Sequence, residues 1–371
     1  MRIAILTEFF VPHVGGTEVR LYEIARRLVA RGHDVDVFTI RHSLEVPEEE
    51  QVDGVYVHRY AYSPGYVTPN GMRSYTGVLR YSLSTALKAI GTGYDVYYFG
   101  QWPMLHTLLT EPLVSPCVQE WCEVWRRDIV ALEKTVGRLM ENHVAVSEFT
   151  KHRMTEFLKM DPNRVIVIPN GVDLRQFNGG TSTRTWGRLV YIGRLAPHKG
   201  LDNLIEAVRM VKERDSQVEL FIAGSGTSLP TLKEHARRVD GVHILGHVTE
   251  AEKVALLKSS WLFLMPSSRE GLGIAPLEAM AAGTPVLTVD HPDNGLKEIC
   301  RYGNGIVTSP DDVSIAEAVS KLLRNEGEWN AMSKASVRFV EGYDWGMIAD
   351  RMEAYLNSIV NDGHAFFSRI S

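Results

Sequence analysis

The second half of the chain repeats a single pattern, in which a short apolar strand is followed by an amphipathic helix. Strands are predicted at residues 188–193, 218–223, 242–246, 261–265 and 285–289, and helices at 201–213, 229–239, 250–258 and 274–282. Strands that are joined through helices pack as parallel neighbours, because each helix returns the chain to the same end of the sheet. This alternation predicts an α/β domain that is built on a parallel sheet.

The first half shows the same signs. Residues 3–6 form a continuous apolar run, which is typical of a strand buried on both faces. The next helix places Leu21, Ile24 and Leu28 on one face and ends at Gly32. Further strands are predicted at residues 35–40, 55–57, 94–99 and 144–146, and helices at 73–90, at 126–141 and at 148–159 behind an N-cap at Ser147. A second α/β domain is therefore expected.

The length of 371 residues suits two domains, each with its own core. The segment 174–187 has the small, polar composition of an exposed linker, and a new strand begins directly after it. We therefore predict an N-terminal domain at 1–173 and a C-terminal domain at 188–345. A helix at 346–362 follows, with apolar residues at helical spacing.

Composition excludes some classes of protein. Hydrophobic residues make up 44% of the chain and charged residues 23%, as in soluble globular proteins, and no apolar run approaches the ~20 residues of a membrane span. The net charge of −5 argues against a nucleic-acid partner. Three cysteines without a Cys-x-x-Cys pair, and an N-terminus without a secretory signal, favour a cytoplasmic protein.

Two segments leave a peripheral contact with the inner membrane face open. The first is a local group of cations, Arg126, Arg127, Lys134 and Arg138, which could face acidic lipid but fits a solvated helix face better. The second is the segment 72–90, which we expect to pack in the core or to line an acceptor groove. The sequence carries no indication of the oligomeric state.

Residues 266–285 contain the densest group of functional candidates. Pro266 ends a buried strand, and Glu270 follows in a loop whose Gly271 and Gly273 let a ligand approach the backbone. The next helix starts there with unpaired N–H groups, which favour an anion. Glu278 lies within that otherwise apolar helix, where a buried carboxylate requires a partner.

Other candidates follow predicted strands. Arg194 and Lys199 lie at the carboxyl end of strand 188–193, where open α/β sheets bind ligands. Gly224 and Gly226 follow strand 218–223, and either a nucleotide or a tight turn accounts for them. Residues 15 and 16, both glycine, open the first helix, where they suit a phosphate or form a plain turn.

Glu270 and Glu278, together with Gly271, Gly273 and the run 283–286 (Gly-Thr-Pro-Val), resemble a known family. It comprises the retaining nucleotide-sugar glycosyltransferases of the GT-B fold, the glycosyl transferase group 1 family, which includes relatives of glycogen and sucrose synthase. The resemblance implies two Rossmann-like parallel-sheet domains that face a central cleft. It also implies that the C-terminal helix 346–362 returns to the first, acceptor-side domain.

The resemblance further implies roles for individual residues. Arg194 and Lys199 would hold the donor diphosphate, Glu270 the hydroxyls of the donor sugar and Glu278 the ribose. Because protein cations neutralise the diphosphate, no metal and no cofactor other than the donor is expected. The implied donor-binding set is Gly15, Gly16, Gly193, Arg194, Lys199, Gly224, Gly226, His247, Val248, Glu270, Gly271, Leu272, Gly273, Ile274 and Glu278.

The chain departs from this family at the segment 116–125, which lacks the histidine that usually faces the reacting sugar. Cys122 stands at the matching position, and a thiol is a weak hydrogen-bond donor. Three explanations are open. Glu120 or Glu123 makes the hydrogen bond to the sugar instead, the enzyme works without that bond, or the protein has lost catalysis and kept donor binding. The plain interpretation of Cys122 as a small buried hydrophobe also stands. Arg194, Lys199, Glu270, Glu120 and Cys122 are therefore the catalytic candidates.

Three other functions compete with sugar transfer to a glycan, lipid or small-molecule acceptor. A metal-dependent transferase would use Asp34 and Asp36, but their alternation with valines fits the wet side of a half-buried edge strand better. A scaffold or sensor would bind a nucleotide sugar without turnover. A phosphorylase or an epimerase would use the same fold.

Overall fold

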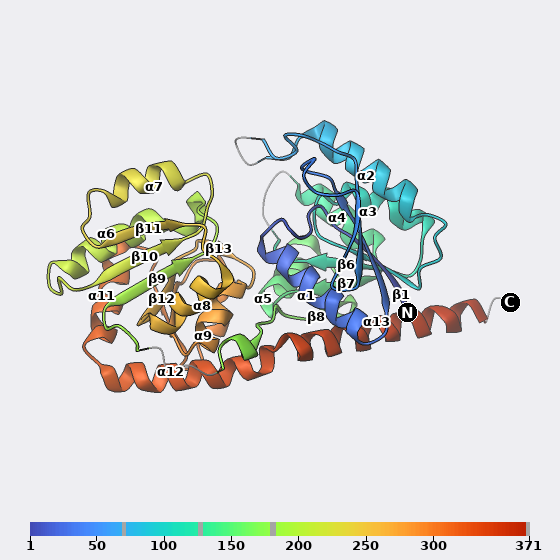
Figure 1. The fold of residues 1–371 in the computed structure, drawn as a ribbon. Helices are drawn as coiled ribbons and strands as arrows, with labels where there is room; N and C mark the ends of the chain where they lie inside the picture. The colour runs from blue at the N-terminus through green and yellow to red at the C-terminus, as the bar shows by residue number, and fades with distance from the viewer. Residues whose placement is uncertain (69–71, 125–128, 179–182, 369–371) are drawn as a thin grey trace. The chain divides into compact units, whose positions relative to one another are not determined.

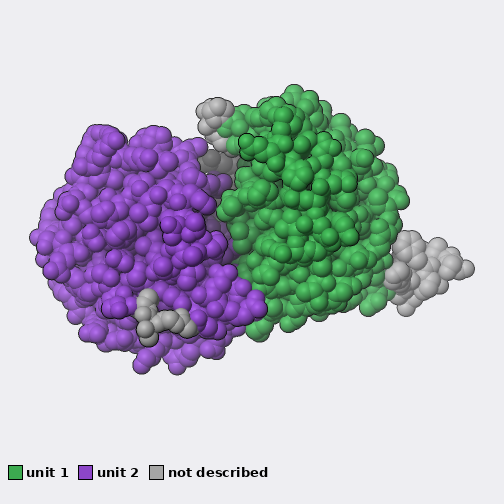
Figure 2. All heavy atoms as spheres, viewed as in Figure 1, with its two compact units in different colours: residues 1–170, 345–371 green, residues 171–344 purple. Residues whose placement is uncertain are grey.

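The computed structural model describes residues 1–68, 72–124, 129–178 and 183–368. The chain divides into two compact units, coloured separately in Figure 2: unit 1 comprises Met1–Asn170 and Trp345–Ser371, and unit 2 comprises Gly171–Asp344. The segment 174–187, which we predicted as a linker, falls within unit 2 and begins with the 3-10 turn Leu174–Gln176. Residues 179–182 of that segment lie outside the described residues.

Unit 1 contains an eight-stranded sheet in the order β3-β4-β2-β1-β5-β6-β7-β8. All neighbours are parallel except β3 and β4, which form an antiparallel pair. β2 is therefore an interior strand, so the expectation of an edge strand there was wrong. The strands are β1 Arg2–Leu6, β2 Asp34–Ile40, β3 Glu49–Val52, β4 Val55–Tyr60, β5 Val96–Phe99, β6 Cys117–Trp121, β7 Asn142–Ala145 and β8 Val165–Val167.

The helices of unit 1 are α1 Gly16–Ala30, α2 Tyr75–Ala89, α3 Leu105–Thr110, α4 Val130–Leu139, α5 Glu148–Arg153 and the C-terminal α13 Trp345–Ser368. α13 packs on α1, where Arg31 donates to the carbonyl of Gly346 at 3.0 Å and His33 Nε2 lies 2.8 Å from a Glu353 carboxylate oxygen. Local signals explain two boundaries. Gly32 has φ +86° directly after α1, and Ser147 accepts a hydrogen bond from the amide of Thr150 before α5.

Unit 2 contains a six-stranded sheet in the order β11-β10-β9-β12-β14-β16, and all of its neighbours are parallel. A short pair, β13 Arg269–Glu270 with β15 Asp293–Asn294, lies outside this sheet. The strands are β9 Arg188–Ile192, β10 Glu219–Ala223, β11 Val242–Gly246, β12 Leu262–Met265, β14 Val286–Val289 and β16 Gly305–Thr308. The helices are α6 Leu201–Lys212, α7 Leu229–Ala236, α8 Glu250–Ser259, α9 Ile274–Ala281, α10 Leu296–Ile299, α11 Asp312–Leu323 and α12 Glu326–Val340.

The prediction of two α/β domains with parallel sheets is confirmed (Figure 1). In each sheet the strand order reverses at one point, between β1 and β5 in unit 1 and between β9 and β12 in unit 2. At such a point, the loops that follow the two neighbouring strands lead to helices on opposite faces of the sheet. The loops therefore separate, and an open crevice forms at the carboxyl ends of the two strands. These two places are where each unit is expected to bind a ligand.

One side of helix α2 packs in the core, as one of the two alternatives for segment 72–90 predicted: Tyr81 and Ala89 belong to hydrophobic core clusters of unit 1. The side that faces unit 1 includes Gly77, Ser82 and Thr85, together with Tyr81. Its leucines face outward, with Leu79, Leu83 and Leu87 exposed by 50%, 46% and 75%. Helical periodicity alone does not say which side packs inward, and small residues allow the closer approach. The basic group 126–138 is only partly described, because Arg126 and Arg127 lie outside the described residues.

The core of unit 1 contains one carboxylate with an unusual environment. Glu133 on α4 is fully buried, and neither of its carboxylate oxygens has a hydrogen-bond partner among the described residues. Burial, with a smaller contribution from Glu123, raises the pKa of Glu133 from 4.5 to about 8. Between these two values the folded chain holds a proton that the unfolded chain releases. Stability should therefore fall as the pH rises through this window, by up to about 1.4 kcal/mol per pH unit.

We expect Glu133→Gln to abolish most of this loss, because glutamine is neutral at every pH in the window. Urea unfolding at pH 5 and at pH 8 gives the free energy of unfolding at each pH, and the difference between the two values is the loss of stability. Glu45→Gln is the matched control, since Glu45 is exposed in the same unit and its replacement should leave the pH dependence unchanged. An equal loss of stability in the parent and in Glu133→Gln would show that Glu133 is ionised in the folded protein.

Candidate functional site

The reversal point of the sheet in unit 2 brings two loops together. The loop after β9 carries Lys199, and the loop after β12 leads to Glu270 in β13. Lys199 Nζ lies 2.6 Å from Glu270 Oε2, and the two side chains are only 11% and 15% exposed. Cation and carboxylate therefore meet at the edge of the sheet where a ligand is expected.

One glycine allows this meeting. Gly200, which follows Lys199, has φ +67°, and a Cβ atom there would lie 2.4 Å from the carbonyl oxygen of Pro266. The amide of Ser268 donates to the carbonyl of His198 at 2.9 Å, which joins the same two loops. A side chain at position 200 would push the loops apart and separate Lys199 from Glu270.

The β9 loop also carries an unpaired cation. Arg194 is exposed, and its guanidinium has no hydrogen bond or ion pair to any residue that the structure describes. Burial, assisted by the nearby cations Lys199, Arg269 and Arg194, lowers the pKa of His198 to about 3. The imidazole is therefore neutral at physiological pH, and the positive potential of this loop favours an anion.

Glu278 has the partner that its burial requires. Its Oε1 accepts from Lys253 Nζ of α8 at 2.6 Å, and the two side chains are 12% and 15% exposed. Lys253 also lies 2.8 Å from Glu250. Lys253 was not predicted, because it lies on another helix and nothing near it in the sequence marks it as a partner.

The glycines after β10 have a structural explanation. Cβ atoms at Gly224 and Gly226 would lie 1.9 Å and 2.2 Å from the carbonyl oxygens of Gly193 and Leu195. The amide of Leu195 donates to the carbonyl of Ser225 at 2.8 Å, so the two loops are packed backbone to backbone. This packing accounts for both glycines and leaves their contact with a nucleotide as a prediction.

The remaining predicted residues of unit 2 lie at two places. Gly271, Leu272, Gly273 and Ile274 lead into α9, whose N-cap Gly273 makes no side-chain capping bond. His247 and Val248 follow β11, the edge strand of the sheet. Among the described contacts, none joins His247 or Val248 to Lys199 or Glu270.

In unit 1 the structure brings the glycine pair and Cys122 together. Gly15 caps α1, Gly16 has open space where a Cβ would stand, and Thr17 Oγ1 lies 3.7 Å from Cys122 Sγ. Burial raises the pKa of Cys122 well above its usual value, so the thiol stays protonated at neutral pH. Cys122 can act as a weak hydrogen-bond donor there, but not as a thiolate nucleophile.

Glu120 forms a buried ion pair in unit 1. Its side chain is fully buried, and Oε1 accepts from Arg20 Nε at 2.6 Å and from the Tyr98 hydroxyl at 2.8 Å. Arg20, only 1% exposed, also donates to the carbonyls of Ile168 and Pro169. Its carboxylate therefore balances a buried guanidinium, and the role of Glu120 in place of the missing histidine stays a prediction.

Comparisons with known proteins decide the family. A model described as glycosyl transferases group 1 matches residues 184–339, and one described as glycosyltransferase family 4 matches residues 14–176. An uncharacterized glycosyltransferase of Methanocaldococcus jannaschii is 30% identical, over 94% of this chain and 96% of its own. The chain belongs to the group 1 glycosyltransferases.

Two solved structures share the fold of this family member. Sucrose-phosphate synthase from Thermosynechococcus elongatus superposes with a TM-score of 0.80 at 18% identity, over 97% of this chain and 99% of that one. HepE of Anabaena in complex with UDP-glucose gives a TM-score of 0.75 at 18% identity, over 96% and 100% of the two chains. These likenesses confirm the predicted GT-B fold.

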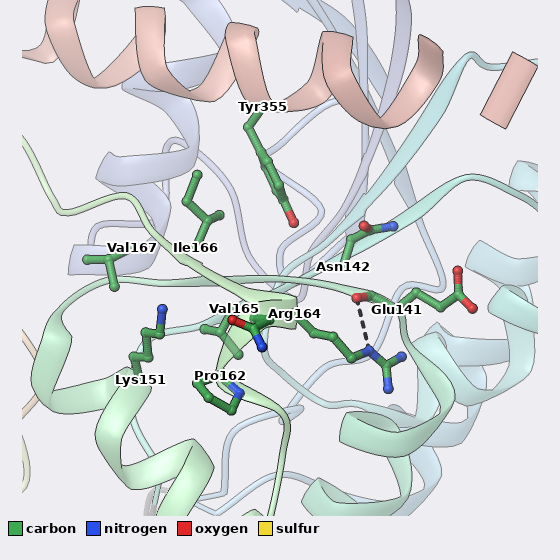
Figure 3. Close-up of a pocket in the computed structure, with 10 residues that line it drawn as sticks. Glu141, Asn142, Lys151, Pro162, Arg164, Val165, Ile166, Val167 and Tyr355 are labelled. Atoms are coloured by element: carbon green, nitrogen blue, oxygen red, sulfur yellow. Dashed lines mark hydrogen bonds between the residues drawn. The ribbon is translucent and has the colours of Figure 1, made fainter. Parts of the chain in front are cut away.

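Unit 1 of this glycosyltransferase contains a groove of about 760 Å³ (Figure 3). Lys151, Arg164, Val167 and Tyr355 are among the residues that line it, beside β8 and α13. None of the predicted site residues lines this groove.

The family member also carries polar pairs that the sequence did not reveal. At the carboxyl end of β1, Glu8 is 5% exposed and its Oε1 accepts from Arg73 Nε at 2.8 Å. Asp36, half of the Asp-x-Asp considered for metal, instead lies 2.7 Å from His58 Nε2. Within the described residues, no group of three or more His, Cys, Asp or Glu side chains is arranged to hold a metal ion. No described helix is long and apolar enough to cross a membrane.

Proposed function

We propose that this group 1 glycosyltransferase moves a sugar from a nucleotide-diphosphate sugar to a glycan, lipid or small-molecule acceptor. In this proposal the donor binds in unit 2, at the carboxyl ends of β9 and β12. Transfer retains the anomeric configuration, as the family resemblance implies, and requires no metal.

The observation that carries the proposal is the grouping of Arg194, Lys199 and Glu270. Sugar transfer creates a diphosphate leaving group, and preorganised cations that face it lower the barrier. Arg194 offers an exposed guanidinium, and Lys199 is held in place by Glu270 at 2.6 Å. An arriving diphosphate would compete for Lys199, which frees the carboxylate of Glu270 to accept hydrogen bonds from sugar hydroxyls.

The two acids of the motif have different tasks in this proposal. Glu270 lies in β13 beside Lys199, whereas Glu278 lies within α9 beside Lys253. A hydrolase would need an acid and a base on either side of one bond. Separate lysine partners suit contacts with separate parts of a long ligand, with Glu270 at the sugar and Glu278 at the ribose.

A screen of the purified protein against UDP-, GDP- and ADP-sugars tests donor binding by the shift in melting temperature. HepE of Anabaena, which shares the fold, forms a complex with UDP-glucose, so UDP-sugars are the first series to test. A ligand that binds only the folded protein adds about 2.7 kcal/mol of stability at 100 times its Kd. We expect one nucleotide series to raise the melting temperature of the parent and to have less effect on Arg194→Ala. No shift with any nucleotide sugar, at millimolar concentration, would count against the proposal.

The proposal also predicts the response to a chelator. Protein cations that already neutralise the diphosphate leave no electrostatic need for Mg²⁺ or Mn²⁺. Turnover of the donor should therefore be the same, within twofold, in excess EDTA and in added Mn²⁺. Activity that EDTA abolishes and Mn²⁺ restores would contradict the metal-free mechanism.

A second candidate is a protein that binds the nucleotide sugar without turnover. The observation that favours it is Cys122, a weak donor, at the position where the resembled family has a histidine. Donor binding without release of nucleoside diphosphate, in the presence of a broad set of acceptors, would select this alternative.

A further inference from the structure

The groove shown in Figure 3 is lined only by residues of unit 1 and runs beside β8, the last strand in the order of its sheet. The three residues of that strand, Val165–Val167, line one side of the groove, and Tyr355 of α13 lines another. The volume of about 760 Å³ falls within the range of sites that hold small molecules. The groove therefore has room for a ligand with both a charged and an uncharged part.

Two cations line this groove without an acid that neutralises them. Lys151 of α5 makes no side-chain hydrogen bond or ion pair with any residue that the structure describes. Arg164 donates from Nε to the carbonyl of Glu141 at 3.3 Å and from Nη2 to the carbonyl of Met140, so the acceptors of these two bonds are uncharged. Glu141 also lines the groove, but its carboxylate points away from Lys151 in Figure 3. The groove thus has a positive potential that favours an anion.

Polar groups beside these cations suit the hydroxyls of a ligand. Asn142 donates from Nδ2 to the carbonyl of Cys117 at 3.1 Å, which fixes the amide and leaves its oxygen to accept from a ligand. Tyr355 reaches from α13 toward β8 (Figure 3). Burial raises the pKa of Tyr355 to about 12, so its hydroxyl stays protonated at neutral pH and can donate. Ile166 adds apolar surface on which the C–H groups of a sugar ring can pack.

A peptide fits the groove less well than a small molecule. The free edge of β8 could pair with an extended segment of another chain, as some sheet edges do. However, β8 has only three residues, and short edge strands are one of the means by which proteins prevent such pairing. The cations and polar side chains of the groove are therefore better explained by a small anionic ligand.

We propose that this groove binds a phosphorylated sugar. The phosphate contacts Lys151 and Arg164, and the sugar hydroxyls form hydrogen bonds with Asn142 and Tyr355. Inorganic phosphate would leave most of the groove without contacts, and a neutral sugar would leave both cations without a counter-charge. The proposal uses no residue of the donor site in unit 2, so it stands or falls separately from the proposed function.

Calorimetric titration of the full-length chain with the 1- and 6-phosphates of glucose and mannose tests the proposal. At least one of the four should bind the parent with a Kd below about 1 mM, and at least tenfold more tightly than glucose, mannose or inorganic phosphate. Lys151→Met should weaken this binding at least tenfold, and Tyr355→Phe at least threefold, because each change removes a contact with the ligand. Melting temperatures verify that both variants are folded, which is expected for Lys151→Met because the Lys151 ammonium has no described partner.

Lys134→Met and Tyr56→Phe are the matched controls. Lys134 is a partly exposed lysine on α4, Tyr56 is 50% exposed on β4, and neither lines the groove. Both variants should bind the sugar phosphate within twofold of the parent. Arg194→Ala separates the groove from the donor site, because a sugar phosphate that occupied the donor site would bind this variant more weakly. It should also bind within twofold of the parent.

Three results would overturn the proposal. The first is that none of the four sugar phosphates binds the parent. The second is that Lys151→Met binds them as the parent does, and a loss in Arg194→Ala would then place the ligand at the donor site. The third is that inorganic phosphate binds as tightly as the sugar phosphates and loses affinity in Lys151→Met, which would reduce the groove to a site for a bare anion.

Discussion

Lys199→Met is expected to lower turnover of the nucleotide sugar by about 10²–10³, or roughly 3–4 kcal/mol of transition-state stabilisation, by analogy with the loss of an oxyanion-hole donor. Methionine keeps most of the volume of lysine and removes the charge that would face the leaving diphosphate. The rate of nucleoside diphosphate release measures the effect once the donor is known.

Stability has to be separated from chemistry in this experiment. Lys199 and Glu270 are both largely buried, so the single change leaves a carboxylate without its counter-ion and lowers the free energy of unfolding. The double variant Lys199→Met/Glu270→Gln should regain stability without regaining turnover. Lys297→Met is the control, because Lys297 pairs with Asp290 at 2.8 Å outside the candidate site. Near-parental turnover in a folded Lys199→Met protein would remove Lys199 from the mechanism.

Glu120→Gln is expected to destabilise unit 1 by about 3–5 kcal/mol, the typical cost of removing one partner of a buried ion pair. Arg20 would keep its charge at 1% exposure, while the oxygens that accept its described hydrogen bonds would all be uncharged. Urea unfolding of parent and variant measures the difference.

The control for this prediction is a surface pair of the same unit. Glu48→Gln breaks an ion pair with Arg41 in which Glu48 is 69% exposed, and such pairs contribute about 0–1 kcal/mol. A cost for Glu120→Gln as small as that for Glu48→Gln would show that the buried pair is not needed for folding. Turnover measured where the variant is fully folded should stay close to that of the parent, because the Glu120 side chain is fully buried.

Part of this architecture follows from local signals in the sequence. The strand and helix alternation predicts the parallel sheets, and parallel strands place their carboxyl ends at one edge. Arg194, Lys199 and Glu270 could therefore be grouped from their positions after strands alone. The need for glycine at position 200 was not predicted, because the close approach to Pro266 is visible only in the structure.

Other features depend on long-range packing and could not be predicted. The burial of Glu120 results from Arg20, 100 residues earlier in the chain, and the partner of Glu278 comes from a different helix. The outward side of α2 is a third case, because its leucines and its mostly smaller buried residues share the same helical period. Which stripe packs inward is decided by the space beneath the helix.

In the proposed mechanism the donor diphosphate binds to the cations Arg194 and Lys199 in the loop after β9. Calorimetric titration of the nucleoside diphosphate that the screen selects, into the parent, Arg194→Ala and the exposed control Arg214→Ala, tests this binding without any acceptor. We predict at least tenfold weaker binding for Arg194→Ala and an unchanged Kd for Arg214→Ala. An unchanged Kd for Arg194→Ala, or equal losses in the two variants, would contradict the mechanism.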